Sequence, residues 1–191
     1  KALVAHGKQE IPLARAREFK EFNRHWIRLL KEHTSAGDLL PRYGTAGFLK
    51  KCNEAGILPT RNFKTGRFPE ADSISGETLT EKYLIKNSGC LSCPIRCERR
   101  VMVQGKEVKG PEYETVGMLG SNIENADLEK INVWNHQADL LGLDTISLGG
   151  TLAFAMELKE RGIKDFGIRF GSSEGIAEAL NGIAYREDGF T

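Results

Sequence analysis

Apolar residues recur along most of this chain at the three- and four-residue spacing of amphipathic helices. The clearest case is the segment 11–33, where one predicted helical face carries Phe19, Phe22, Trp26, Leu29 and Leu30. The same spacing predicts further helices over about 45–55, 75–85, 128–141, 147–161 and 173–184. A helix-rich chain is therefore expected.

Residues that start and stop helices stand at the ends of these segments. Ser75 and Asn125 occupy positions where a helix cap is expected. Gly56, Gly142 and Gly162 occupy positions where helices should end, because glycine accepts the left-handed conformation that closes a helix.

A short hairpin is expected between the helices. Residues 100–103 and 107–108 flank the turn Gln104-Gly105-Lys106, which is typical of two paired strands. The predicted fold class is therefore mainly α, a multi-helical domain with at most one small β-hairpin. Trp26 and Trp134 lie on apolar helix faces and are assigned to the core.

Composition limits the size and the setting of the protein. The chain has 191 residues, of which 40% are hydrophobic, enough for one domain with a core. Residues 1–10 are interpreted as the exit strand of a missing upstream domain, and 11–191 as a helical domain. The 27 basic and 26 acidic residues are interleaved, which argues against a nucleic-acid partner. No apolar run approaches a membrane span and no signal peptide is seen, so a cytoplasmic protein is expected.

Three of the four cysteines fall in one short segment. Cys90, Cys93 and Cys97 form the pattern C-x2-C-x3-C, whereas Cys52 lies apart. Such spacing lets one loop bring several thiolates to a metal centre, and thiolates suit both iron–sulfur clusters and zinc. A fourth ligand must then be Cys52, a histidine or a residue outside the chain. A structural zinc site and unrelated buried thiols are the alternatives. Three nearby arginines would offset the charge of thiolates, or simply form a basic surface patch: Arg96, Arg99 and Arg100.

The order of five short motifs narrows the choice of family. They are Pro41–Thr45 (PRYGT), Asn62–Gly66 (NFKTG), the cysteine segment Cys90–Cys97, Gly110–Glu114 (GPEYE) and Asp139–Ser147 (DLLGLDTIS). Their order and spacing resemble those of the aldehyde:ferredoxin oxidoreductase family. The resemblance runs from the first residues to about Arg161.

The resemblance implies a domain of a tungsten-pterin, iron–sulfur enzyme. Family members hold tungsten in a bis-pterin cofactor beside a [4Fe-4S] cluster. They oxidise an aldehyde with water to a carboxylic acid and pass electrons to ferredoxin. This chain would be the helical second domain, without the upstream domain and the third, downstream domain. Cys90, Cys93 and Cys97 would be cluster ligands, the fourth cysteine would lie downstream, and Cys52 would be a packing residue. We expect the cluster and the tungsten (or molybdenum) cofactor to be absent from the isolated chain, which should be inactive.

Acidic residues supply the remaining site candidates. The match gives Asp139, Leu143 and Asp144 as pterin-binding residues and Glu114 as a catalytic residue near the metal. A carboxylate suits the edge of a pterin, because it accepts hydrogen bonds from the amino group and ring N–H found there. Asp139 also lies in the last turn of a predicted helix, where the helix dipole disfavours a negative charge. Helix capping is the alternative for Asp144, and dipole complementarity is the alternative for Glu114.

The substrate and two other functions stay open. Val133 occupies the position of a second active-site glutamate in some aldehyde oxidisers, so a small aldehyde or a related carbonyl compound is expected. His136 is interpreted as structural. The other functions are a non-catalytic iron–sulfur electron-transfer subunit and a zinc-stabilised interaction module. Asp139 and Asp144 favour the enzyme, because an electron carrier has no use for a site that binds hydrogen-bond donors.

Overall fold

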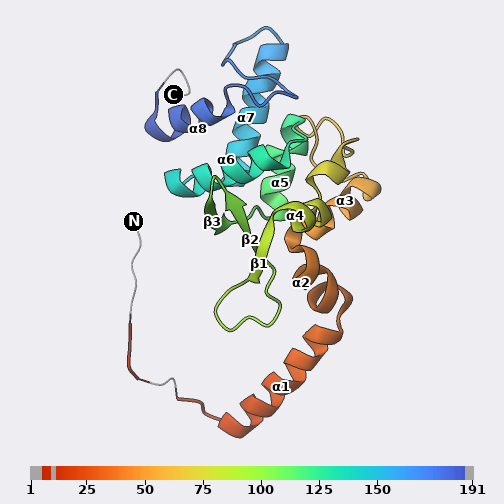
Figure 1. The fold of residues 1–191 in the computed structure, drawn as a ribbon, viewed down its shortest axis with the longest axis vertical. Coiled ribbons are helices and arrows are strands. Elements are labelled where there is room, and N and C mark those ends of the chain that lie inside the picture. The colour runs from red at the N-terminus through yellow and green to blue at the C-terminus, as the bar shows by residue number, and fades with distance from the viewer. Residues whose placement is uncertain (1–5, 10–11, 188–191) are drawn as a thin grey trace.

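The structure is a computed structural model that describes residues 6–9 and 12–187, and helices dominate it (Figure 1). The α-helices are α1 (Ala16–Glu32), α2 (Leu40–Tyr43), α3 (Leu49–Ala55), α4 (Gly76–Tyr83), α5 (Tyr113–Leu119), α6 (Leu128–Leu141), α7 (Thr145–Glu160) and α8 (Ile176–Tyr185). Shorter helical turns lie at Thr34–Leu39, Thr45–Phe48, Ala71–Ile74 and Ser121–Ile123. The predicted mainly α class is confirmed, whereas the exit strand expected over 1–10 falls mostly outside the described residues.

A single antiparallel sheet with strand order β1-β2-β3 interrupts the described helices. Its strands are β1 (Leu84–Ser88), β2 (Glu98–Val103) and β3 (Lys106–Lys109). β2 and β3 form the predicted hairpin, and β1 is an addition, because the apolar spacing had assigned its first residues to the end of a helix. Ser88 pairs with Glu98. The cysteine segment is therefore a loop that this pair closes at its base (Figure 1).

The described core consists of two apolar clusters that share α6. The first cluster lies between α3, α4, α5 and the sheet, and the second between α6, α7 and α8. Ile131 of α6 belongs to the first cluster, and Trp134 belongs to the second, where it is 2% exposed as predicted. Gly149 lets α7 approach α5, because a Cβ there would stand only 2.6 Å from the Met118 Cβ.

Helix α1 has an apolar face with no cover among the described residues. None of its residues is buried, and it extends away from the helices around the sheet (Figure 1). Phe22 and Trp26 stack on each other at 6.5 Å between ring centroids, and Trp26 is 48% exposed. The assignment of Trp26 to the core is wrong. Periodicity identifies the apolar face of a helix but does not show whether another element covers it.

Helix ends follow the predictions at most positions. Ser75 caps α4 by accepting the Thr78 N–H at 3.2 Å, and Gly142 ends α6 in the left-handed conformation. The cap of α6 is Asp127 rather than Asn125. Asn125 is buried instead, and its Oδ1 accepts the Asp127 N–H at 3.1 Å. The helical turns over 34–43 have no counterpart in the predicted elements.

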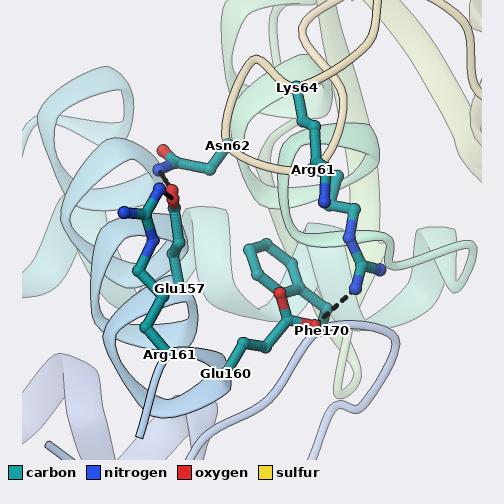
Figure 2. Close-up of a pocket in the computed structure, with 7 residues that line it drawn as sticks. All are labelled: Arg61, Asn62, Lys64, Glu157, Glu160, Arg161 and Phe170. Carbon is teal, nitrogen blue, oxygen red and sulfur yellow. Dashed lines mark hydrogen bonds and ion pairs between the residues drawn. The ribbon is translucent and has the colours of Figure 1, made fainter. Parts of the chain in front are cut away.

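Side chains of the loop before α4 hydrogen-bond to side chains of α7. Together they line a charged cavity of about 440 Å³ (Figure 2). The cavity is lined by Arg61, Asn62, Lys64, Glu157, Glu160, Arg161 and Phe170. Arg61, Asn62 and Phe63 have φ angles of 49°, 50° and 61°, a run of left-handed residues that costs about 1–2 kcal/mol per residue. Arg61 pairs with Glu124 and Glu160, so ion pairs and backbone hydrogen bonds hold this strained turn in place.

Candidate functional site

The predicted metal ligands lie in the loop between β1 and β2. Cys90 is exposed, whereas Cys93 and Cys97 are half-buried. The loop turns tightly, because the Cys93 N–H donates to the Cys90 carbonyl at 3.0 Å and Ser92 has a left-handed φ of 62°. Within residues 6–9 and 12–187, no three His, Cys, Asp or Glu side chains are gathered so that they could hold a metal ion. The loop thus places three thiols in one segment without arranging them around a common point.

A buried arginine, Arg99 of β2, holds the end of this loop against α2. Arg99 is only 2% exposed. Its guanidinium donates to the carbonyls of Pro41 at 3.0 Å, Arg42 at 2.9 Å, Leu40 at 3.3 Å and Arg96 at 2.8 Å. The first three carbonyls belong to α2, and the Leu40 carbonyl also accepts the Gly44 N–H at 2.9 Å. Arg99 therefore joins the PRYGT motif to the cysteine loop.

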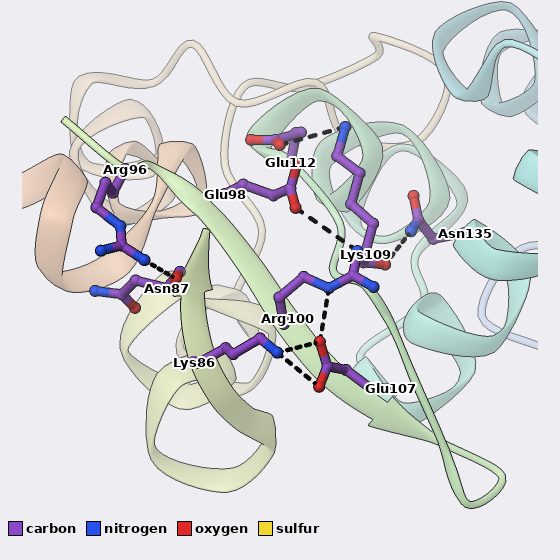
Figure 3. A network of polar contacts seen from close by, with 9 residues as sticks. All are labelled: Lys86, Asn87, Arg96, Glu98, Arg100, Glu107, Lys109, Glu112 and Asn135. Atoms are coloured by element: carbon purple, nitrogen blue, oxygen red, sulfur yellow. Dashed lines mark hydrogen bonds and ion pairs between the residues drawn. The ribbon is translucent and has the colours of Figure 1, made fainter. Parts of the chain in front are cut away.

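The other two arginines beside the cysteines lie at the surface. Arg100 pairs with Glu98 and Glu107, and Lys86 shares Glu107 from β1 (Figure 3). Arg96 is exposed and donates to a backbone carbonyl of β1 at 3.0 Å. Solvent screens these charges, and surface pairs of this kind contribute little to stability.

Cys97 and the buried arginine share one environment beside Gly44. Gly44 has a φ of 67°, and a Cβ there would lie 2.8 Å from the Cys97 carbonyl oxygen and 3.4 Å from Arg99 Nε. Burial raises the pKa of the Cys97 thiol, and the charge of Glu112 raises that pKa further. Burial lowers the pKa of Arg99, and the negative charges of Cys97 and Glu112 act in the opposite direction. Close packing at Gly44 thus places the buried cation next to the last cysteine.

The segment 41–45 (PRYGT) also contacts the start of α5. The Thr45 hydroxyl donates to Glu112 Oε2 at 2.6 Å and accepts the Tyr113 N–H at 2.8 Å. Glu112 is the N-cap residue of α5 but makes no side-chain cap bond of its own. The segment 41–45 therefore lies between the cysteines and the helix that carries Glu114.

All four predicted catalytic and cofactor-binding residues line one open cavity of about 330 Å³. Glu114 comes from the first turn of α5 and Asp139 from the last turn of α6. Leu143 and Asp144 follow Gly142, which ends α6 and turns the chain toward α7. Among the described residues, four carboxylates line the cavity, whereas Lys109 is its one cationic lining residue. The excess of negative charge favours a ligand that offers hydrogen-bond donors or positive charge.

Asp144 also caps α7, which was the alternative interpretation. Its Oδ2 accepts the Ser147 N–H at 2.8 Å. The hydrogen bonds from Ser147 lower the pKa of Asp144. Capping and cavity lining are therefore both properties of this side chain, and its contact with a pterin stays a prediction.

Asn135 is a cavity residue that the sequence did not reveal. It is 5% exposed, and its Nδ2 donates to the Lys109 carbonyl at the end of β3 at 3.1 Å (Figure 3). Asn135 precedes Asp139 by four residues, about one turn of α6, and this spacing is the one signal that could have found it. Nearby, the hydroxyls of Thr115 and Thr145 hydrogen-bond at 2.8 Å and join α5 to α7.

Cys52 and Val133 lie apart from the cavity lining. Cys52 of α3 is half-buried against the first apolar cluster, as expected of a packing residue. Burial raises the pKa of the Tyr113 phenol, and a side-chain hydrogen bond with Cys52 adds to this rise. Val133 packs against both clusters.

The fold and the site define a helical domain in which the segment 41–45 joins a loop of three thiols to a cavity lined by carboxylates. The family profile described as "Aldehyde ferredoxin oxidoreductase, domains 2 & 3" matches residues 21–191. The chain belongs to this family, so the predicted resemblance is confirmed.

Named relatives agree with the profile. The chain is 45% identical to the tungsten-containing aldehyde ferredoxin oxidoreductase of Pyrococcus abyssi and 44% identical to that of Thermococcus kodakarensis, each over 98% of this chain and 32% of the relative. It is also 28% identical, over 98% of this chain and 31% of the relative, to the aliphatic sulfonate oxidoreductase WOR-like subunit of Pyrococcus furiosus. The chain thus spans about a third of the length of these curated relatives. None of the described helices could span a membrane.

Proposed function

We propose that these residues form the middle domain of a tungsten-pterin oxidoreductase that oxidises an aldehyde with water to a carboxylic acid and passes electrons to ferredoxin. One observation carries this proposal: a single cavity is lined by Glu114, Asp139, Leu143 and Asp144 from separate elements. The names of the tungsten-containing relatives support it, and their greater length leaves room for other walls of the site.

The cavity fits the edge of a pterin because its wall is rich in acceptors. The amino group and ring N–H on that edge are donors, and the carboxylates of Asp139 and Asp144 would accept them. Asn135 adds a neutral acceptor, since the hydrogen bond from its Nδ2 to Lys109 leaves Oδ1 for a ligand. A helix dipole disfavours a carboxylate in the last turn by about 0.3–1 kcal/mol. Hydrogen-bond donors from a ligand would offset this unfavourable interaction at Asp139.

The cysteine loop fits an iron–sulfur cluster by the chemistry of its donors. Cys90, Cys93 and Cys97 would supply soft thiolates, with a fourth ligand from another part of the longer protein. Beside this loop, Arg99 Nε is a buried donor without a partner in the part of the chain that the structure describes, as expected next to a site that a negatively charged group completes. When bound, the cluster supplies an electron relay between the tungsten site and ferredoxin.

Glu114 is the residue we assign to proton transfer. It is exposed on the cavity wall, where a carboxylate can take a proton from the water that adds to the carbonyl carbon. One less similar relative is named for aliphatic sulfonates rather than aldehydes. The aldehyde assignment therefore rests on the more similar relatives.

The first test measures tungsten, iron and sulfide in the full-length protein and its variants. Asp139→Asn would set a donor against a donor, and a lost hydrogen bond to a charged group costs about 1.5–3 kcal/mol. We expect tungsten content to fall while iron, sulfide and helical content stay at wild-type values. Replacing each cluster cysteine with Ala should instead remove iron and sulfide. Wild-type tungsten in both Asp139→Asn and Asp144→Asn would overturn the pterin site, and zinc without iron would favour the interaction module.

A second measurement isolates the role of Glu114. Glu114→Gln keeps the shape and removes the charge, and general acid–base catalysis typically contributes about two to four orders of magnitude in rate. We expect turnover to fall by that factor with tungsten content unchanged. Glu129→Gln is the control, because Glu129 lies in the first turn of α6 and is not among the cavity residues. Normal turnover with a lower melting temperature would make Glu114 a structural residue.

A further inference from the structure

Arg99 is a buried cation whose hydrogen bonds, within the described residues, are all with uncharged groups, and Glu112 acts on it only through its charge. The Nη atoms donate to four backbone carbonyls in the described part of the chain, three of them in α2. Burying a charge is costly unless an opposite charge compensates it. Arg96 is exposed and Arg100 is paired with Glu98 and Glu107, so neither carries this cost. The position of Arg99 therefore calls for a counter-charge that the hydrogen bonds do not supply.

The geometry of the guanidinium identifies the donor that is left over. Arginine has five N–H donors, and four hydrogen bonds to carbonyls occupy the two Nη groups. The fifth donor, the Nε–H, is buried and has no hydrogen-bond partner among residues 6–9 and 12–187. Lysine could not divide its donors in this way, because its ammonium group lacks the fixed planar fork.

The unpaired donor lies beside the last cysteine of the loop. A Cβ on Gly44 would approach both Arg99 Nε, at 3.4 Å, and the Cys97 carbonyl oxygen, at 2.8 Å. Cys97 directly precedes β2, and Arg99 is the second residue of β2. Burial lowers the pKa of Arg99 and the negative charge of Cys97 raises it, so the two side chains lie close enough to interact electrostatically.

We propose that Arg99 is the counter-ion and N–H donor of the Cys97 sulfur in the iron–sulfur cluster, and that it raises the reduction potential of that cluster. The inference rests on the proposed function, because it requires the cluster. An added electron makes the cluster more negative, so a fixed positive charge nearby favours the reduced form. Hydrogen bonds to the sulfurs are a recognised determinant of cluster potentials. Arg99 is thus a positioning residue and not a catalytic one.

The test compares midpoint potentials of the cluster in the full-length protein by redox titration with EPR detection. We expect Arg99→Met to lower the equilibrium constant for one-electron reduction about tenfold, a shift of about 59 mV. Arg99→Lys keeps the charge without the directed Nε–H and should give a smaller shift. Arg96→Met is the matched control, because Arg96 is exposed and directly precedes Cys97. Equal shifts for Arg99→Met and Arg96→Met, or none for Arg99→Met with the cluster retained, would overturn the inference.

A measurement on the unaltered side chain covers the case in which Arg99→Met fails to fold. In protein labelled with ¹⁵N-arginine, the reduced cluster should show a ¹⁵N hyperfine coupling that is lost in Arg99→Lys. Absence of the coupling in the wild type, or its persistence in Arg99→Lys, would reject the hydrogen bond. A wild-type protein without iron and sulfide would instead reject the proposed function, so the two failures are distinguishable.

Discussion

At the residue scale, Asp144 combines a cap with a place on the cavity wall, and substitutions can separate these roles. Asparagine caps a helix about as well as aspartate, so Asp144→Asn should keep the melting temperature of wild type. Asp144→Ala removes the cap and should lower the melting temperature by about 2–4 °C. If the carboxylate holds the pterin, both variants of the full-length protein should lose tungsten. Tungsten retained in Asp144→Asn would reduce Asp144 to its capping role.

The cap also has a pH dependence whose sign follows from the pKa of Asp144. Hydrogen bonds from Ser147 lower this pKa below its ordinary value of 3.8. The contribution to stability is therefore full above the ordinary value and is lost as the pH falls through the folded-state pKa. Asp144→Ala should remove this acid-sensitive part of the unfolding curve.

Residues such as Arg99 and Asn135 mark the limit of sequence pattern at this scale. The order of the motifs predicts that Glu114 and Asp139 share one site, because motifs carry side-chain chemistry at fixed spacing. Arg99 and Asn135 act through backbone carbonyls distant in sequence, in α2 and at Lys109. Contacts of that kind depend on the folded arrangement, so the sequence alone does not identify the partner carbonyls.

At the scale of elements, the lack of buried residues in α1 leads to a prediction about its stability. Most helical stability in proteins comes from packing of an apolar face, and α1 has no buried residue. In the 191-residue chain, we expect amide hydrogens of α1 to exchange much faster than those of α7, which has six buried residues. Mass spectrometry of exchange at the peptide level would measure the difference. Equal protection of the two helices would show that the stripe of α1 is covered.

Prediction of the elements succeeded where local signals act alone. Ser75 and Gly142 were recognised as helix ends because capping and left-handed glycine depend on nearby backbone groups. Asn125 was misassigned because a cap residue is defined by where its neighbours turn helical, and Asp127 does so two residues later. β1 was missed because its pairing with β2 spans the whole cysteine loop.

At the scale of the whole molecule, a packed core in the described residues coexists with an open cavity and a loop of separated thiols. The two apolar clusters share α6, so the 191-residue chain should fold cooperatively. Its three loop thiols are not gathered around a point in the described structure, and the carboxylate cavity is open. We therefore expect the purified chain to contain no stoichiometric iron, sulfide or tungsten and to oxidise no aldehyde. Metal analysis and a dye-linked assay would check this, and one zinc per chain would favour a structural zinc site.

The unlike surroundings of Trp26 and Trp134 give the molecule two intrinsic fluorescent reporters. The sequence contains two tryptophans, one 48% exposed on α1 and the other 2% exposed in the second cluster. Iodide in solution should quench the first and spare the second, and the first should emit at longer wavelength because water surrounds it. A blue shift of that component in a longer form of the protein would reveal contact on α1 without any label.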